Sequence, residues 1–599
     1  MAIATKVTIE IAGNKLPDFV HLTIDQTIHQ PHYFQLVCRR DILEKPGDSP
    51  LSSSIKKIGS VITFFIEGIN SGIDQKDLYL KGIITDVSTS ESSSKQDIIF
   101  SGHSPDILLD GYPSCRSFEN MTLKQIVQEV IKPFPKDQIS LKGDPSNDGQ
   151  MPYIIQYNET NYEFLHRIAA RMGEWFFYDG QKLVFGDYER STLKGVLGIN
   201  LSNFSIGAKI VPLKFNLHRY FYHRNTTLEI KSSASDITNN LNTIGKQLQD
   251  QSLKSFPEES VNYAPVEFIK DDGTNIVSQP GPGIGDREKQ KLAMGMVIVN
   301  CQCTEPLGVG NVIQIKSLDG SHNESDIGDY LVTSIHHSID NSMNYQNTFT
   351  GIPAETKISP ESDIHATARC ETQSAIVKDN NDPQKWGRAR VHFVWQKEGQ
   401  MSPWLRIVNL YGGKDFGSYF VPEINSEVLV GFEGADPQRP YIIGPMRNKE
   451  WKPDEKWVTQ TNDFKIIKTR SGHIIKFNDT KGSEKITIQA HGDIELVGNN
   501  IRFSAQNNIE MTGGNLIQMQ SDQGKIAIIS QNTSINTDMT GVSISADQSV
   551  DISGGESGLQ IETADVTLSG TSVEIKSTTE TKLGSDAIVE ISGSMVKIN

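Results

Sequence analysis

The C-terminal part of the chain carries a pair of apolar residues, two positions apart, that recurs about every eight residues. Between the pairs lie Gly, Asn, Asp, Ser and Thr, the residue types that favour turns. A period of about eight has room for one strand of roughly five residues and a corner, with a single apolar face. After Trp457 the chain contains no Trp, Tyr, Cys or Pro, which separates this segment from the rest. We predict a repeat domain over residues 481–599.

The apolar face of this repeat needs a cover that one chain does not readily supply. A single-chain parallel solenoid uses about 20 residues or more per coil, and no such longer period is obvious in the sequence. We therefore predict that three identical chains intertwine as a triangular prism, a trimeric β-helix with the apolar pairs inside. A single-chain solenoid and a flat sheet are the alternatives, and a flat sheet would leave long aggregating edges. The predicted trimer core consists of Ile486, Ile488, Ile494, Leu496, Ile509, Met511, Ile517, Met519, Ile526, Ile528, Val550, Ile552, Val566, Leu568, Val573 and Ile575.

The N-terminal part, residues 1–355, alternates apolar and polar positions as strands do, and two helices interrupt it. Thr122 and Thr160 are each followed three residues later by Gln or Glu, so both predict a capping box at a helix N-terminus. Pro133 and Gly173 predict the ends of the two helices. The predicted fold class is therefore mainly β with some α.

The middle of the chain differs in composition from both ends. Residues 382–448 contain short strand-like segments and turns, and about five strands in this length predict a small closed barrel. We expect a linker over 356–381 and a neck over 449–480. Residues 231–290 are polar and rich in turn formers, which predicts loops.

Charge and hydropathy limit the function classes. The 599 residues include 57 Lys and Arg against 73 Asp and Glu, for a net charge of -16, so the chain as a whole repels phosphate backbones. The mean hydropathy is -0.37, and no run approaches the roughly 20 apolar residues of a membrane helix. The N-terminus lacks the apolar core of a secretory signal. Five cysteines are too few for a disulfide framework and favour a reducing compartment.

Candidate chemistry is sparse. Cys301 and Cys303 fall on one face of a predicted strand, which favours buried thiols over a metal pair. His29, His32 and the pair His336–His337 have no second pair at zinc-like spacing. The known motifs for nucleophilic, zinc-dependent and phosphate-loop chemistry are absent from the sequence. We predict no catalytic, metal-binding or cofactor-binding residue and no enzyme activity.

Several motifs carry a family resemblance. Asp382–Trp395, Trp404–Ile407 and Phe420–Pro440 resemble the oligonucleotide-binding-like (OB-like) barrel of VgrG proteins, the trimeric spike tips of type VI secretion systems. Gln156–Ile168 and Gly328–Thr333 look like the tail-hub domain of the same family. Together with the repeat, the similarity extends over nearly the whole chain in family order.

The resemblance implies a function and a set of partners. Residues 1–355 would form a phage tail-hub-like domain with a β-barrel, 382–448 the OB-fold-like barrel, and 481–599 the needle. The chain would be a structural spike of a contractile apparatus that punctures membranes and delivers effectors. It would bind a tube protein of the Hcp type and the baseplate through the hub, and effectors and their adaptors elsewhere. It would assemble in the bacterial cytoplasm and be ejected, without a signal peptide, to the extracellular space or a target cell.

The resemblance also implies a cap at the end of the needle. The repeat reaches Ile598 with nothing to cover the strand edges and apolar interior, so a PAAR-type tip protein is expected there. The predicted docking residues are Ser594, Met595, Val596, Lys597, Ile598 and Asn599.

Two other functions remain open at this point. A phage-type spike with cell-wall hydrolase activity is the alternative, although only about 30 residues separate Arg447 from the repeat, too few for a hydrolase domain. Single-strand nucleic-acid binding by stacking is the second, but we predict no nucleic-acid partner, because the negative charge and the family pattern favour inter-subunit or shaft-capping contacts for the residues concerned. These residues are Trp386, Trp395, Trp404, Arg388, Arg390 and Arg406.

Overall fold

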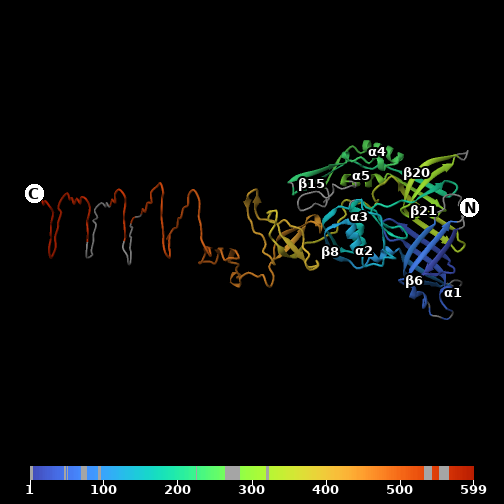
Figure 1. The fold of residues 1–599 in the computed structure, drawn as a ribbon, viewed down its shortest axis with the longest axis horizontal. Helices are drawn as coiled ribbons and strands as arrows, with labels where there is room; N and C mark the ends of the chain where they lie inside the picture. Colours follow the sequence, from blue (N-terminus) through green and yellow to red (C-terminus); the bar gives the residue numbers. More distant parts are fainter. Residues whose placement is uncertain are drawn as a thin grey trace. The chain divides into compact units, whose positions relative to one another are not determined.

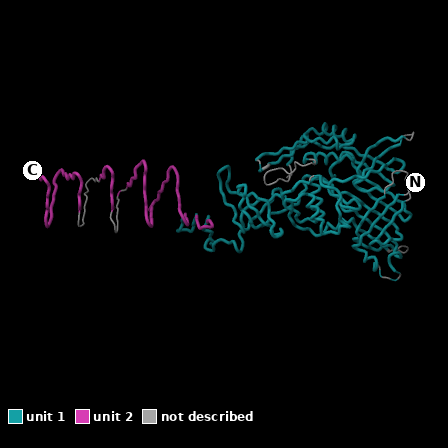
Figure 2. Tube along the Cα trace, viewed as in Figure 1, with its two compact units in different colours: residues 1–467, 475–487 teal, residues 468–474, 488–599 magenta. Residues whose placement is uncertain are grey.

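The computed structural model describes residues 5–598 except 46, 48, 50, 69–76, 92–95, 147, 224, 264–282, 319–322, 530, 532–541 and 552–565. The chain forms two compact units (Figure 2). Unit 1 comprises residues 1–467 and 475–487, and unit 2 comprises 468–474 and 488–599. Unit 1 contains almost all of the regular secondary structure.

A thirteen-stranded sheet dominates the N-terminal part of unit 1 (Figure 1). Its strands run in the order β14-β18-β21-β20-β3-β4-β7-β6-β5-β1-β2, and β19 joins β13 to β20. The alternating apolar residues of these strands bury one face, as the sequence predicted. The strands are β1 Thr5–Ile11, β2 Asn14–Lys15, β3 His21–Thr27, β4 Tyr33–Arg39, β5 Val61–Gly68, β6 Leu78–Glu91, β7 Gln96–His103, β13 Thr192–Val196, β14 Leu201–Ala208, β18 Val297–Cys303, β19 Val312–Leu318, β20 Glu324–Asp340 and β21 Tyr345–Pro353.

Two helices pack together with small sheets beside the large one. In helices α2 (Leu123–Ile131) and α3 (Asn161–Met172) both expected capping boxes form, with Thr122 and Thr160 as the N-caps. Gly173 ends α3 in the left-handed region, at φ 75°, which only glycine adopts readily. Both helix predictions are confirmed. The other elements here are α1 Arg40–Leu43, β8 Ser114–Thr122, β9 Leu141–Lys142, β10 Gln150–Glu159, β11 Phe176–Tyr178 and β12 Leu183–Phe185.

The prediction of loops over 231–290 is wrong for the described part of that segment. It contains α4 (Thr243–Ser255) and the start of α5 (Ile284–Met294), together with strand β17 (Ser260–Tyr263). The Asn242 side chain caps α4, and apolar residues of both helices pack against the core of the large sheet. β17 pairs in parallel with β15 (Phe215–Phe221), which also pairs with β16 (Thr226–Lys231).

The OB-like domain is built on a four-stranded sheet in the order β23-β22-β26-β27. Strand β22 lies within the segment expected as a linker, so the sheet begins before Asp382. Around Trp404 the chain forms isolated bridges, between Ala389 and Leu405 and between Ile407 and Ile442. The strands are β22 Gln373–Asp379, β23 Arg390–Phe393, β24 Gly412–Gly413, β25 Phe416–Gly417, β26 Glu427–Phe432 and β27 Pro440–Pro445.

A three-stranded sheet follows in the expected neck and at the start of the repeat. Its strands are β28 Phe464–Lys468, β29 Ile474–Asn478 and β30 Lys485–Gln489, in that order. In the described residues after Gln489 there is no further helix or strand. The trace of unit 2 runs repeatedly back and forth across its own long direction (Figure 2). The mainly β fold class is confirmed, whereas the trimeric β-helix stays a prediction.

Candidate functional site: the exposed apolar repeat and the barrel

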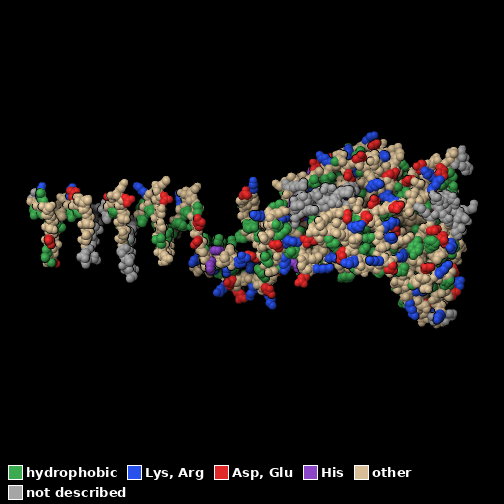
Figure 3. Space-filling view, in the orientation of Figure 1, with side chains coloured by type: hydrophobic (Ala, Val, Ile, Leu, Met, Phe, Trp, Pro, Cys, Tyr) green, Lys and Arg blue, Asp and Glu red, His purple; other side chains and the backbone are tan. Residues whose placement is uncertain are grey.

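The apolar pairs of the repeat lie on the surface of the single chain. The described members of the predicted trimer core are between 47% and 71% exposed. Every described residue from 491 to 598 is exposed, and the last buried apolar residue among those described is Ile442. Apolar side chains are visible along the described parts of this segment in Figure 3. One chain therefore does not bring these side chains into a core.

After Gln489 the described backbone of the repeat also has no hydrogen-bonding ladder of its own. Among the described residues after Gln489 no backbone–backbone hydrogen bond is present. Backbone donors and acceptors next to apolar surface need partners, since an unpaired group removed from water costs free energy. Exposed apolar pairs and backbone groups without backbone partners therefore occur together in the described part of this segment.

Most of the predicted docking residues at the C-terminal end are exposed as well. Met595 is 75% and Ile598 87% exposed. Ser594, Val596 and Lys597 are exposed in the same segment. Asn599 of this set and Ile552 of the predicted core lie outside the described residues. The structure leaves both sets as predictions.

The tryptophans and arginines of the OB-like domain do not form one surface. Arg388 is buried and forms a bidentate ion pair with Asp382, with both N–O distances 2.9 Å. The Arg388 guanidinium holds the pKa of Asp382 at about 2. The Trp386 ring, half exposed, lies over that guanidinium at 4.8 Å. The sequence did not single out Asp382, because an ion pair six residues apart leaves no periodic signal.

The other members of this group point to different neighbours. Arg390 binds Glu119 of the hub at 2.8 Å. Trp395 stacks on Phe393 and donates from Nε1 to Gln373 at 3.0 Å. Arg406 lies over the ring of Tyr222 at 4.0 Å, and Trp404 is partly buried. A continuous face for stacking nucleic-acid bases is therefore not formed by these residues.

The thiols of Cys301 and Cys303 and the rings of His32 and His337 lie buried inside the hub. Cys301 and Cys303 are buried on one face of β18, as predicted, and burial raises the pKa of both thiols. His337 is fully buried, and its Nδ1 and Nε2 atoms lie 2.8 Å from Tyr345 Oη and 3.1 Å from Gln26 Oε1. Burial lowers the pKa of His32 and His337 to about 3, so both rings are neutral at pH 7.

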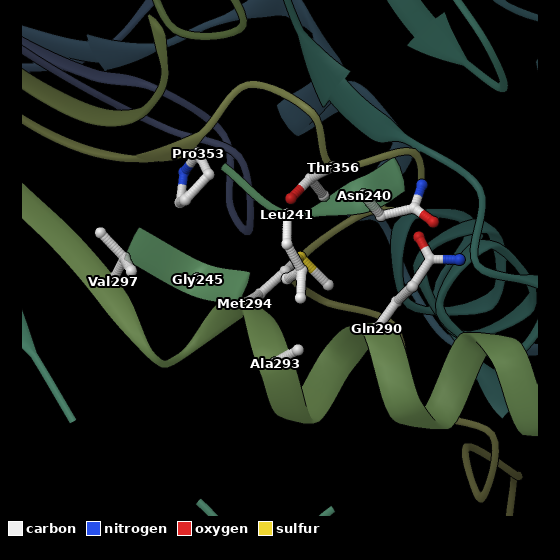
Figure 4. A pocket seen from close by; sticks show the side chains of 9 residues that line it. All are labelled: Asn240, Leu241, Gly245, Gln290, Ala293, Met294, Val297, Pro353 and Thr356. Atoms are coloured by element: carbon white, nitrogen blue, oxygen red, sulfur yellow. The ribbon is translucent and has the colours of Figure 1, made fainter. Parts of the chain in front are cut away.

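No group of three or more His, Cys, Asp or Glu side chains suited to a metal ion occurs in the described part of the chain. A small cavity lies between α5 and residues 240–245 (Figure 4). Its volume of about 10 Å³ fits a single water molecule. The buried Gln290 Oε1 at its wall has no hydrogen-bond partner among the described residues and would accept from that water.

A larger open groove of about 830 Å³ runs beside α2. Apolar side chains such as Met121 and Phe134 line it, together with Lys132 and Lys136. Its lining includes one carboxylate, Glu129, and neither histidine nor cysteine. The lining therefore offers no pair of carboxylates for acid–base chemistry.

Two family models match the parts of the chain that the fold separates. Residues 26–201 match the phage tail baseplate hub model. Residues 373–446 match the model of the type VI secretion system and phage-baseplate injector OB domain, and that range begins with β22. A hub followed by this OB domain defines the class of baseplate hub and spike proteins of contractile injection machines.

Curated relatives of the chain are spike proteins of type VI secretion systems. The chain is 23% identical over 437 residues to the spike protein VgrG1c of Pseudomonas aeruginosa, covering 65% of this chain and 56% of the relative. It is 23% identical over 446 residues to VgrG1a of the same organism, covering 66% of this chain and 65% of the relative. Over about two thirds of its length the chain is similar to spike proteins of the VgrG family, the resemblance that its motifs indicated.

This chain spans only part of the length of these relatives. The aligned regions cover 56% of VgrG1c, 55% of VgrG1b and 65% of VgrG1a. A chain in the structure of a Francisella PdpA–VgrG complex shares the fold, with 11% identity and a TM-score of 0.51 over 81% of this chain and 85% of that one. Among the described residues, no helix is long and apolar enough to cross a membrane.

Proposed function

We propose that this chain is a structural spike of a type VI secretion apparatus and works as a homotrimer whose repeat forms a puncturing needle. The observation that carries the proposal is the exposure of the described apolar pairs, in a segment whose described residues after Gln489 form no strand. Two further copies carry the same pairs in the same order. Three copies around one axis can therefore bury every pair and supply every strand with neighbours.

The burial energy favours such an assembly. A fully buried Ile, Leu, Val or Met side chain contributes about 1.5–3 kcal/mol relative to an exposed one. The fifteen described members of the predicted core are roughly half exposed in one chain. Burying these side chains in three chains would contribute tens of kcal/mol. This gain is of the same order as the entropy cost of bringing three chains together and ordering them.

The needle geometry suits the transmission of axial force. Stacked strands lie about 4.8 Å apart, so about fifteen octads give a needle of roughly 70 Å. Each chain would be hydrogen-bonded to its neighbours along its length, which resists buckling. Unfolding one chain would require unwinding the other two, so the needle should be kinetically stable.

We propose partners at both ends of the spike. A tube protein of the Hcp type and the baseplate would bind the hub, and effectors with their adaptors would travel with the spike. A PAAR-type tip protein would cover the end of the needle, for which the exposed Met595 and Ile598 supply apolar contact area. The complex of a Francisella VgrG with PdpA supports the idea that spikes of this family bind further proteins. Assembly would take place in the bacterial cytoplasm, and the apparatus would eject the spike.

We propose that the chain itself has no catalytic activity. One relative of the chain, from Vibrio cholerae, is named an actin cross-linking toxin, and the cell-wall hydrolase alternative also predicts turnover. Purified protein is expected to digest neither peptidoglycan nor nucleotides nor lipid above a buffer control. Turnover that a single carboxylate or serine substitution abolishes would overturn this part of the proposal.

The spike function is tested by secretion from cells in which this chain is the sole spike protein. Deletion of its gene is expected to abolish release of the tube protein into the medium, and the wild-type chain should restore it. Ile526→Asp, with a charge in the predicted core, should fail to restore release, whereas Ser521→Asp at an exposed corner should succeed. Undiminished release without the gene would refute the function.

The docking of a tip protein is tested by removing Ser592 to Asn599. The truncated chain is expected to stay trimeric and to lose binding of the tip protein in a pull-down assay. Undiminished binding by the truncated trimer would place the partner elsewhere.

A further inference from the structure

The open groove beside α2 is built by one continuous stretch of the hub. All of its lining residues lie between Asn120 and Leu141, at the end of β8, along α2 and on the segment that leads from the helix to β9. Its volume of about 830 Å³ is within the range of about 300–1,000 Å³ that ligand pockets have. The groove is therefore large enough to receive side chains of a partner.

The apolar part of the lining is only half covered by the protein itself. Four apolar side chains pack on the hub core with part of their surface and leave the rest accessible in the groove. These are Met121, Ile131, Phe134 and Leu141. An apolar side chain of a partner would remove this remaining surface from water, which favours binding.

Strand β9, which carries Leu141, is the edge of its sheet. It pairs only with β12, in parallel, and Leu183 N donates to Ser140 O at 2.9 Å. In a parallel ladder this contact leaves the N–H and C=O groups of Leu141 pointing away from β12. Neither group has a backbone partner in the described part of the chain. An extended peptide can pair with such an edge, and pockets then receive its alternate side chains.

Two lysines give the lining an excess of positive charge. Lys136 is exposed and forms no ion pair with a described residue. Lys132 lies 3.6 Å from Glu129, and the two side chains are 74% and 50% exposed. An exposed pair of this kind is weak, so Lys132 can also bind a carboxylate of a partner. The groove thus carries two cations against one anion on a chain with a net charge of -16, which favours an acidic occupant.

We propose that the groove beside α2 binds an extended segment of a partner protein in which large apolar and acidic residues alternate. The segment would pair with the edge of β9 at Leu141 and place an apolar side chain against Phe134. Its carboxylates would bind Lys132 and Lys136. The groove would hold on the hub a protein that travels with the spike. That use rests on the proposed spike function, whereas the binding itself does not.

Fluorescence anisotropy with synthetic peptides tests the chemistry of the groove on the full-length protein. The probe is a fluorescein-labelled peptide in which Leu and Glu alternate over about eight residues, the length of an ordinary strand. We expect it to saturate and to bind roughly tenfold more tightly than a peptide of alternating Leu and Lys or of alternating Ser and Glu. Equal binding of the three peptides, or no saturation of the Leu–Glu peptide below millimolar concentration, would overturn the proposal.

Charge reversal tests the location of the bound peptide. Lys132→Glu combined with Lys136→Glu changes two exposed side chains, so the hub should stay folded. The double variant should bind the Leu–Glu peptide roughly tenfold more weakly and the Leu–Lys peptide more tightly, an exchange that damage to the fold would not produce. Lys254→Glu, in the last turn of α4 and outside the groove, is the matched control and should bind like the wild-type chain. Undiminished binding of the Leu–Glu peptide by the double variant would place it elsewhere.

A larger side chain tests the space inside the groove. Gln128 is an exposed lining residue on α2, so Gln128→Trp would fill the groove without removing a core residue. This variant should lose peptide binding and keep the wild-type midpoint of urea unfolding. Full binding by Gln128→Trp would overturn the groove as the site. A second copy of the chain is the other possible occupant, and a change in the mass of the protein in solution on charge reversal would overturn the assignment to a partner segment.

Discussion

Ile517→Asp places a charge in the proposed core of the needle and should strongly destabilise it. Ile517 belongs to an apolar pair and is 52% exposed in the single chain. In the prism the substitution would remove three buried side chains, worth about 1.5–3 kcal/mol each when fully buried. It would also place three carboxylates near one axis, at an effective penalty of several kcal/mol per buried ion. The combined loss is on the order of 10 kcal/mol per trimer, as large as the stability of a typical domain.

Ser521→Asp is the matched control, because it introduces the same charge four residues further along the chain. Ser521 is exposed and its Oγ accepts a hydrogen bond from Gly524 N at 3.0 Å. An Asp carboxylate can accept the same hydrogen bond, so the expected change is within about 0.5 kcal/mol.

The assay is guanidinium-induced loss of the trimer, followed on unboiled gels and by sedimentation. Ile517→Asp should lower the midpoint of trimer loss clearly below that of the wild-type chain, and Ser521→Asp should leave it unchanged. Equal midpoints for the two variants would show that position 517 does not face a shared core, and would refute the assignment of the apolar pairs.

Three further predictions concern unit 1. Burial raises the pKa of Asp106 to about 7, although the hydrogen bond from Ser104 acts to lower it. An Asp in the unfolded chain titrates near pH 3.9, so between these pH values the folded hub holds a proton that the unfolded chain releases. The free energy of unfolding should therefore fall by up to about 4 kcal/mol as the pH rises from about 4 to 7. Urea unfolding should show this slope in the wild-type chain and a flatter profile in Asp106→Asn. Asp382→Ala leaves Arg388 buried without its partner and should cost about 3–5 kcal/mol in the unfolding of the OB-like domain by urea, whereas a change below about 1 kcal/mol would refute the importance of that ion pair. Thr160→Ala removes the N-cap of α3 and should cost about 0.5–2 kcal/mol in hub stability by urea unfolding, with Thr160→Ser as the control that retains the cap.

Local signals in the sequence predicted the elements that depend on local interactions. The capping boxes at Thr122 and Thr160 involve residues three apart, so both helix starts could be placed from the sequence. The alternation along β18 likewise predicted that Cys301 and Cys303 share a buried face. The hub and the OB-like domain followed from motifs that the family models match.

Features that depend on tertiary contacts were missed. Helices α4 and α5 have polar sequences whose few apolar residues gain their packing only against the large sheet, so composition alone predicted loops. The buried ion pair between Arg171 and Asp436 joins residues 265 positions apart, so no spacing in the sequence predicts it. For the repeat the difficulty is the reverse, since the apolar pattern is plain in the sequence, while the partners that we propose for it are other copies of the chain.

The mass of the purified full-length protein in solution tests the central claim most directly. Light scattering during size-exclusion chromatography at physiological salt should give three times the chain mass of 66.4 kDa. The value should persist on dilution, because intertwined chains separate slowly. A stable folded monomer at 66.4 kDa with a folded repeat would contradict the account, because it would show that one chain can cover its own apolar pairs.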